Sequence, residues 1–401
     1  MTRLQTDSAL VGANLSVPAG TYTSINVTVT ASSGVFINTS GATIGTCVNG
    51  AVCPTPSGAA TTIQVPISLT LTANQNQWVG LDFNLANAIT TTNGITVDFN
   101  QPNVMTATTT VRPGIPSGSV DTIEDFVGVV TAVSASSITV QSGTTGNSMT
   151  AAISSSTTYD LAPVAYSNCQ GTAAACVTTG STVSLDAALS SSGLLSATEI
   201  DVLDAVALDE VEGTIYPTSQ TGVVGLILAD KVAITSTTPL ATSSTTYGTG
   251  IFLTVDTGTT YSVDTKTLSS QNLGLNALFT GSGDLFAGQT VRVQLSNITS
   301  TSSGISATAN NVLLRWSRLT GTVNSVAGNT FSLANIPGYI NALNPTLSLT
   351  PQVITYINAT AFDGITDVSG LSATSSQLAS IRALYIDRAQ QPFQAAKVRV
   401  P

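Results

Sequence analysis

The stretch Val127-Gly128-Val129-Val130 recurs as Glu212-Gly213-Thr214-Ile215 and again as Thr320-Gly321-Thr322-Val323. Each copy places a glycine before two residues that favour β-strands. Each copy also opens a segment of roughly 80 to 105 residues that closes with a pair of expected strands, as in a tandem repeat. We therefore expect three β-barrel-like repeats, over residues 120–204, 205–316 and 317–401.

The rest of the chain also has a hydrophobic period of two. In Thr21–Thr30, Ile25, Val27 and Val29 alternate with polar residues, as in a strand with one apolar face. Residues 113–119 contain two prolines and two glycines and are interpreted as a linker that ends a first domain, residues 1–112. The expected fold class is all-β, with tandem small β-sandwich or β-barrel domains and very little helix. Helix signals are few, and Ser375–Leu384 has helical spacing, enough for one or two turns.

The composition excludes several classes of function. Only 8% of the 401 residues are charged and there is no histidine, so no site can use imidazole as a base or a metal ligand. The net charge of −10 disfavours nucleic acid as a partner, because phosphates require a basic surface. No run reaches the ~18 apolar residues of a transmembrane helix, so we expect no membrane span.

The four cysteines fall in two close pairs, Cys47 with Cys53 and Cys169 with Cys176. Each pair brackets a stretch of small residues, which favours two local disulfides over four buried thiols and indicates an oxidising compartment. Met1 leads directly into a polar stretch, which is not typical of a secretion signal. We therefore expect an extracellular or cell-surface protein that is exported through a signal not present in this sequence.

Leu15-Ser16-Val17-Pro18-Ala19-Gly20-Thr21-Tyr22 resembles the "L-P-A-G-x-Y" entry to a strand in a bacterial exported and lipoprotein domain family of unknown function. Trp78-Val79-Gly80-Leu81-Asp82-Phe83-Asn84 is similar to the "L-D-F-D" strand of the same family. The family's opening strands precede the segment that corresponds to Leu4–Gly12. The resemblance therefore implies that residues 1–112 form an incomplete β-sandwich domain, completed by a longer natural chain or by a strand from another subunit.

Residues 120–401 resemble tandem copies of a second family of small exported β-domains, also without an assigned function. The shared pattern is G-x-V, a turn, a strand, a later "G-x-x-V-x-V" and a final strand. Ala287-Gly288-Gln289-Thr290-Val291-Arg292-Val293 fits this pattern best. Neither family supplies a catalytic residue that can be carried over to this chain.

The search for chemistry finds no catalytic residue, and we expect no enzyme. Serine and cysteine triads need a histidine, and no phosphate-binding glycine loop occurs. Paired carboxylates remain possible for a hydrolase, with Glu210 and Glu212 as its test positions. They lie in an acidic stretch that is better interpreted as a solvated linker edge. Its members are Glu199, Asp201, Asp204, Asp209, Glu210 and Glu212.

Calcium is the only metal worth considering, because carboxylates and loop carbonyls are its ligands. The weak candidates lie before the first repeat and in a short acidic loop of the third repeat, and neither group has EF-hand spacing. Surface turns are the better interpretation for both, so no cofactor is expected. These candidates are Asp121, Glu124, Asp125, Asp363 and Asp367.

Charge is distributed unevenly along the chain. Residues 1–284 contain 18 acidic and 4 basic side chains, whereas residues 285–401 contain 3 acidic and 7 basic ones. A chain that is acidic at one end and basic at the other suits head-to-tail contact between copies, although a random scatter of 32 charges is the alternative. The expected assembly residues are the acidic stretch named above together with Arg382, Arg388, Lys397 and Arg399.

These observations favour a bacterial, extracellular structural protein that self-assembles into a surface filament or fibre. Head-to-tail contacts and donor-strand complementation would join the subunits, so the expected partner is the chain itself. The first alternative is a cell-surface adhesin or a module that binds a glycan or a protein. The second alternative is the carboxylate-based hydrolase.

Overall fold

The computed structural model divides the chain into two compact units. The barrel unit comprises residues 1–11, 112–189 and 195–401, and the N-terminal β-unit comprises residues 12–111 with 190–194. The structure describes residues 8, 16–29, 35–38, 40–49, 52–54, 60–92, 94–111, 113–115, 118–142, 146–160, 173–203, 209–218, 220–234, 237–242, 245, 248–301, 304–337, 340, 351–386 and 392–400.

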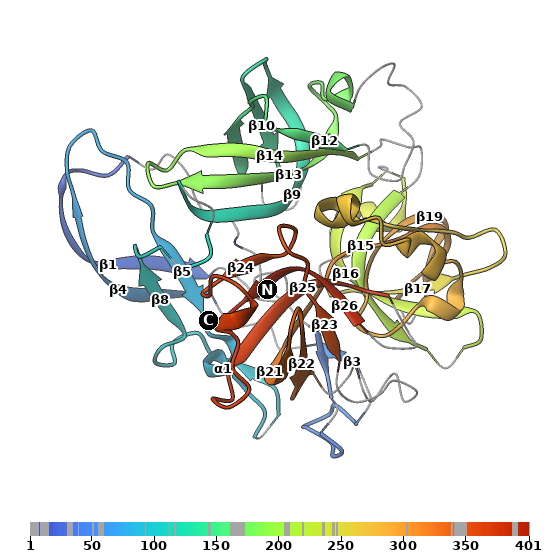
Figure 1. Cartoon of the computed structure of the whole chain (residues 1–401). Coiled ribbons are helices and arrows are strands. Elements are labelled where there is room, and N and C mark those ends of the chain that lie inside the picture. Colours follow the sequence, from blue (N-terminus) through green and yellow to red (C-terminus); the bar gives the residue numbers. More distant parts are fainter. Residues whose placement is uncertain are drawn as a thin grey trace. The chain divides into compact units, whose positions relative to one another are not determined.

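The barrel unit contains three small closed β-barrels in tandem, which confirms the expected all-β fold class (Figure 1). The strands of barrel 1 are β9 (Ser119–Val133), β10 (Ser137–Gln141), β11 (Ser148–Ala152), β12 (Thr158–Asp160), β13 (Thr182–Ser190) and β14 (Leu195–Leu203). The strands of barrel 2 are β15 (Asp209–Pro217), β16 (Val223–Ala233), β17 (Gly250–Thr254), β18 (Thr260–Val263), β19 (Thr290–Thr301) and β20 (Gly304–Leu314). The strands of barrel 3 are β21 (Ser317–Ala327), β22 (Thr330–Ala334), β23 (Gln352–Ile354), β24 (Ala361–Asp363), β25 (Leu378–Tyr385) and β26 (Pro392–Arg399).

Short 3-10 helices connect some of these strands. They are η2 (Ala173–Cys176), η3 (Pro239–Ala241), η4 (Lys266–Gln271), η5 (Leu275–Leu278), η6 (Ser282–Asp284) and η7 (Val368–Gly370). No helix among the described residues is both long enough and apolar enough to cross a membrane.

The three barrels share one topology. In barrel 1 the order is β11-β10-β9-β13-β14-β12, and β11 also pairs with β14. Both β11 and β12 run parallel to β14, so they act as two halves of one interrupted strand that closes a five-stranded barrel. Barrels 2 and 3 repeat this arrangement strand for strand. The order, with a parallel third and fifth strand, is that of the OB-fold, a Greek-key barrel.

The glycine of the repeated motif is required by the close approach of two strands. A Cβ at Gly128, Gly213 or Gly321 would lie 2.3, 2.3 or 2.8 Å from a backbone carbonyl oxygen of the neighbouring strand. No side chain fits at these distances. The recurrence of Gly in the sequence therefore marks the point where the first strand of each barrel passes closest to the second strand.

A buried threonine recurs where the third strand of each barrel is interrupted. The Thr157, Thr259 and Thr360 hydroxyls donate to the carbonyl oxygens of Ala197, Ala309 and Ala395, at 2.9, 2.8 and 2.7 Å. Each hydroxyl oxygen also accepts a backbone N–H from the turn before it. The hydroxyl thus satisfies two backbone groups that the break in the strand would leave buried and unpaired.

Barrels 2 and 3 share apolar packing, whereas barrel 1 has a core of its own. Leu384, Ile386 and Ala396 of barrel 3 pack in the core cluster of barrel 2, and Phe286 of barrel 2 packs in the core cluster of barrel 3. The core cluster of barrel 1 contains only residues between Ile123 and Val202. Among the described residues, the buried cores of barrels 2 and 3 therefore include side chains from each other, whereas the buried core of barrel 1 is made of its own residues.

The N-terminal β-unit consists of two-stranded sheets, and Figure 1 shows β1 and β4 as a long ribbon. The pairs are β1 (Gly20–Val29) with β4 (Thr61–Leu71), β2 (Val35–Ile37) with β3 (Val52–Pro54), β5 (Gly80–Phe83) with β8 (Met105–Thr108), and β6 (Ile89–Thr90) with β7 (Thr96–Val97). A short helix, α1 (Leu85–Ala88), precedes β6. The buried core cluster contains only Ala88, Phe99 and Val104.

Two local expectations have clear outcomes. The Cys47–Cys53 disulfide is present, and Cys176 is also disulfide-bonded, while Cys169 lies outside the described residues. The expectation of a helical turn over Ser375–Leu384 is wrong from Leu378 onward, because that segment forms β25. The burial of Ile381 and Ala383 in the barrel core decides the conformation there.

Candidate functional site

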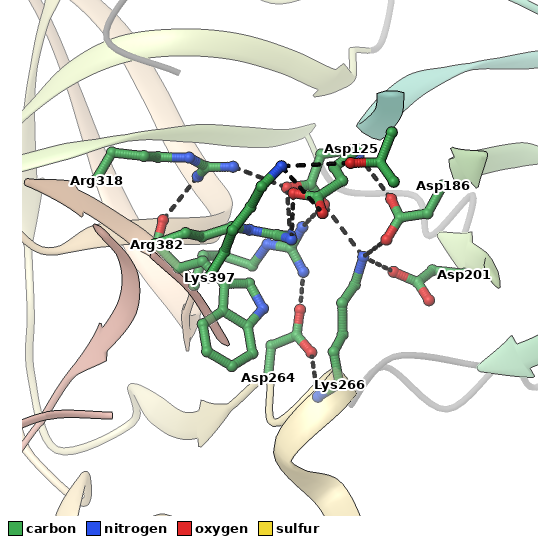
Figure 2. A network of polar contacts seen from close by, with 12 residues as sticks. Asp125, Asp186, Asp201, Asp264, Lys266, Arg318, Arg382 and Lys397 are labelled. Atoms are coloured by element: carbon green, nitrogen blue, oxygen red, sulfur yellow. Dashed lines mark hydrogen bonds and ion pairs between the residues drawn. The ribbon is translucent and has the colours of Figure 1, made fainter. Parts of the chain in front are cut away.

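A buried network of charged side chains lies where the three barrels meet, and Asp125 is at its centre (Figure 2). The Asp125 residue is part of β9 and has a φ of 55°, which interrupts the regular alternation of that strand. Its Oδ1 lies 3.1 Å from Lys266 Nζ and 2.7 Å from Arg315 Nη2. Its Oδ2 lies 3.0 Å from Arg318 Nη2 and 3.0 Å from Arg382 Nη2. One carboxylate of barrel 1 thus receives four cations from barrels 2 and 3.

Lys266 makes the reciprocal connection from barrel 2 into barrel 1. It begins η4, and its Nζ lies 2.8 Å from Asp201 Oδ2, 3.1 Å from Asp125 Oδ1 and 3.6 Å from Asp186 Oδ2. The Asp125 N–H also donates to Asp186 Oδ1 at 2.7 Å. The ammonium group therefore neutralises a set of carboxylates that would otherwise repel one another.

The protonation of these groups follows from burial and from the charges around them. Burial alone would raise the pKa of Asp125, but Lys266, Arg382, Arg315 and Arg318 together hold it well below its usual value. Burial alone would lower the pKa of Lys266, but the nearby aspartates raise it well above its usual value. Both groups are therefore charged over the whole neutral range.

The network continues through barrel 2. Arg315 Nε lies 3.3 Å from Glu212 Oε2, and the Arg315 guanidinium also pairs with Asp264. Glu212 Oε2 is 3.3 Å from Arg292 Nη2, and Arg292 Nε is 3.9 Å from Glu210 Oε1. Glu210 and Glu212 lie near the start of β15, just before Gly213, and this part of the strand passes through the junction.

Trp316 closes the barrel 3 side of the network. The Arg382 guanidinium lies over its ring, 5.6 Å from the centroid, and Arg318 Nη1 donates to the Trp316 carbonyl oxygen at 2.7 Å. Arg382 Nη1 also lies 2.7 Å from Glu124 Oε2, and Lys397 Nζ lies 3.9 Å from Glu124 Oε1. The tryptophan thus supports the two arginines that reach Asp125.

The acidic stretch is not a solvated linker edge. Asp201, Asp209, Glu210 and Glu212 are all buried, because they lie on strands that face the barrel junction. The basic side chains expected to pair with another copy also have partners within the chain, including Arg399 with Asp363 at 3.1 Å. Asp204 and Arg388 lie outside the described residues. Several acidic and basic residues that lie far apart in the sequence therefore pair within one chain.

The carboxylates considered for calcium have other partners. Glu124, Asp125 and Asp363 pair with basic side chains, which occupy the positions that a cation would need. Asp121 accepts hydrogen bonds from the Ser8 hydroxyl and the Thr122 N–H. Asp367 caps η7 by accepting the Ser369 N–H at 2.8 Å, as expected of a surface turn. The structure therefore gives no support to these positions as a metal site.

A different acidic cluster lies on the outer face of barrel 1. Oxygen atoms of Asp160, Glu199 and Asp201 lie within 4.8 Å of one another. Burial and the Asp201 charge raise the pKa of Glu199 to about 8. Asp160 was not predicted, because its proximity to the other two depends on the parallel pairing of β12 with β14, which the sequence does not reveal.

Two cavities of the barrel unit bear on function. One of about 240 Å³ lies beside the acidic cluster and is lined by residues that include Thr158, Glu199 and Arg382. Another of about 400 Å³ belongs to barrel 2 and is lined mainly by polar residues, with Tyr261 and Asp256 among them.

In the part of the N-terminal β-unit that the structure describes, the sheets have only two strands each. Neither β1 nor β4 pairs with a third strand in the described part of residues 16–111. Only two charged side chains, Asp82 and Asp98, occur between residues 12 and 111. Natural proteins usually protect such edges with charge or by covering them. This unit has almost no charge with which to do so.

Residues 1–98 match the family model described as "Domain of unknown function (DUF4382)". The resemblance of the first unit to a domain family without an assigned function is confirmed at that level, while the motif assignments and the second family remain predictions. None of the curated proteins matches the chain.

One similar solved structure is a multidomain protein with nucleic acid binding domains from Streptococcus pneumoniae TIGR4. The identity is 11%, the match covers 72% of this chain and 75% of that chain, and the TM-score is 0.12. The two folds do not superpose at this score, so the similarity carries no argument.

Proposed function

We propose that this chain is a non-enzymatic, extracellular structural subunit that associates with copies of itself, and that the N-terminal β-unit is the module that associates. The observation that carries the proposal is the ribbon of β1 and β4, which has no third strand among the described residues. Two-stranded sheets are marginally stable alone in water. A strand from another copy would form hydrogen bonds with the unpaired backbone N–H and C=O groups at the edge of this sheet.

The thin core of this unit supports the same proposal. Among the described residues between 12 and 111, the buried apolar side chains are Cys47, Val65, Ala88, Phe99, Val104 and Met105. One face of β4, which includes Ile63, Ile67 and Leu69, is only partly covered. Each barrel, in contrast, has an extensive closed core. An added partner strand would therefore stabilise the N-terminal β-unit more than it would stabilise a barrel.

A second copy is the partner that fits this surface best. Both β1 and β4 carry uncharged side chains only, and alternate apolar residues with threonine, serine and other polar residues. An edge of β1 in one copy and an edge of β4 in the next would make a heterologous contact, which propagates into a filament unless it closes into a ring. Pro66 removes one N–H from β4, so pairing would use the residues on either side of it.

The barrels would then serve as a compact body that the association module carries. Their charged junction, buried at the contact of all three barrels, supports a fixed arrangement rather than a flexible string. In this proposal the charges hold one chain together, and the uncharged edges join one chain to the next. This assignment replaces the expected charge pairing between copies.

The proposal is tested by the size and form of the full chain in solution. Light scattering after size exclusion and negative-stain electron microscopy should show concentration-dependent filaments. Thr23→Lys with Asn26→Lys places two lysines at exposed positions of β1 and should abolish them. The matched control, Ser148→Lys with Thr150→Lys, adds the same charge at exposed positions of β11 and should leave assembly unchanged. A wild-type chain that stays monomeric at high concentration would refute the proposal.

One observation favours the alternative of a surface adhesin or a binding module. The 400 Å³ cavity of barrel 2 combines the Tyr261 ring with the hydroxyl groups of Thr257 and Ser282. An aromatic ring with several hydroxyls suits a glycan, because a sugar stacks on the ring and exchanges hydrogen bonds with the rest. Binding of the full chain to a glycan array, lost in Tyr261→Ala but kept in Tyr159→Ala, would support this function.

A further inference from the structure

We propose that the outer face of barrel 1 binds a calcium ion through Asp160, Glu199 and Asp201. The parallel pairing of β12 with β14 creates the site, because it sets Thr158 opposite Glu199 and Asp160 opposite Asp201. Glu199 and Asp201 are two residues apart on β14, so their side chains share one face. Oxygen atoms of the three carboxylates lie within 4.8 Å of one another.

Two buried polar atoms at this place lack hydrogen bonds. Asp201 is 1% exposed, and while its Oδ2 pairs with Lys266, its Oδ1 accepts no hydrogen bond among the described residues. Ser184 is also 1% exposed and lies directly opposite Asp201 in the antiparallel pairing of β13 with β14. The Ser184 hydroxyl likewise has no partner in that set. Buried oxygen atoms without partners are costly, and a cation would satisfy them.

The charge on this face leaves room for a divalent cation. Lys266 is the basic side chain that contacts the cluster, and it is shared with Asp125 and Asp186. Arg315, Arg318 and Arg382 also pair with Asp125, so the cations of the junction gather around Asp125 and the buried Asp201. A divalent ion beside Asp160 and Glu199 would add positive charge at the more exposed end of the cluster without disturbing the Lys266–Asp201 pair.

The donor atoms select calcium. All are carboxylate or hydroxyl oxygens, and the chain contains no histidine, which disfavours zinc and copper. Calcium takes six to eight oxygen ligands at about 2.3–2.6 Å, so ligands on opposite sides of the ion lie about 4.6–5.2 Å apart. The 240 Å³ cavity bordered by Thr158 and Glu199 has room for the water ligands that complete such a shell. Magnesium requires shorter, strictly octahedral coordination, which three partly constrained carboxylates fit less well.

Isothermal titration calorimetry of the full chain, stripped with a chelator and titrated with calcium chloride, tests the site. We expect one ion per chain with a Kd of about 10⁻⁴–10⁻³ M and weaker binding of magnesium chloride. Glu199→Gln and Asp160→Asn should each weaken calcium binding at least tenfold (~1.4 kcal/mol). Glu199→Gln keeps the shape of the side chain, and Asp160 is exposed, so both variants should fold.

Asp367→Asn is the matched control, because it removes an exposed carboxylate from a surface turn in barrel 3. It should leave calcium binding unchanged. Thermal unfolding of each protein with and without calcium gives a second readout, since an ion that binds only the folded state raises Tm. The proposal is overturned if calcium does not bind up to about 10 mM, if magnesium binds equally tightly, or if binding survives both substitutions.

Discussion

Lys266 of barrel 2 lies 2.8 Å from Asp201 of barrel 1, and both side chains are almost completely buried. Replacement of Lys266 by methionine keeps the length of the side chain but leaves three buried carboxylates without their shared cation. Breaking a buried pair by removing one partner costs about 3–5 kcal/mol. Urea unfolding should show a loss of that size for Lys266→Met.

Lys231→Met is the control for this substitution. Lys231 Nζ donates to the carbonyl oxygens of Leu240 and Thr242 on a more exposed surface, so its loss should cost less than about 1 kcal/mol. The double variant Lys266→Met with Asp201→Asn should lose less unfolding free energy than the two single variants lose in sum. Strict additivity would contradict a direct interaction between the two side chains.

Acid should weaken the barrel junction through Asp125. Its pKa is lowered in the folded chain, so its contribution to stability is complete above about pH 4 and is lost as pH falls below that value. Trp316 reports on the junction, because its ring lies under Arg382. In a Trp78→Phe background, the fluorescence of Trp316 should shift to the red on acidification. An unchanged spectrum down to about pH 2 would contradict the expected coupling.

The close approach at Gly213 predicts a large effect of a single methyl group. A Cβ there would lie 2.3 Å from the Ile227 carbonyl oxygen and 2.8 Å from Leu226 Cγ. Gly213→Ala should therefore reduce the free energy of unfolding by about 1–3 kcal/mol. Gly281→Ala meets no atom within 4 Å and has an extended backbone, so its unfolding midpoint should stay at the wild-type value.

The threonine at the interrupted third strand should contribute a similar amount to the stability of each barrel. Thr259→Val removes the hydroxyl that donates to Ala309 and accepts from Asp256, at nearly constant volume. The loss leaves two buried backbone groups unsatisfied, which costs about 1–3 kcal/mol. Thr157→Val and Thr360→Val should behave alike in thermal unfolding, whereas the exposed Thr257→Val should have little effect. A neutral Thr259→Val would show that water replaces the hydroxyl.

The barrels could be predicted from the sequence because their signals are local. Alternation of apolar residues and the recurring glycines at 128, 213 and 321 report on strands and on close approach within each repeat. The secondary structure of Leu378–Leu384 was harder to predict, because the spacing of its apolar residues alone fits a helical turn. The pairing of β25 with β21 and β26 decided its conformation.

The charged junction could not be predicted, because its partners are distant in sequence. Asp125 and Arg382 are 257 residues apart, and nothing in the chain specifies that barrels 1 and 3 meet there. The accumulation of acidic residues early and basic residues late was a real signal of complementary charge. Sequence cannot distinguish pairing within one chain from pairing between two chains, so the expectation of contacts between copies did not follow from the charges alone.

The three barrels are attached to one another by unequal means, since barrels 2 and 3 share an apolar core while barrel 1 is held mainly through charged groups. A small separation of the two charges is enough to break an ion pair, because water then solvates both groups. A pulling force applied across the chain should therefore separate barrel 1 first. Barrels 2 and 3 should stay together and separate from each other only at a higher force. In the assembly proposed above, each subunit would then lengthen in steps before any barrel unfolds.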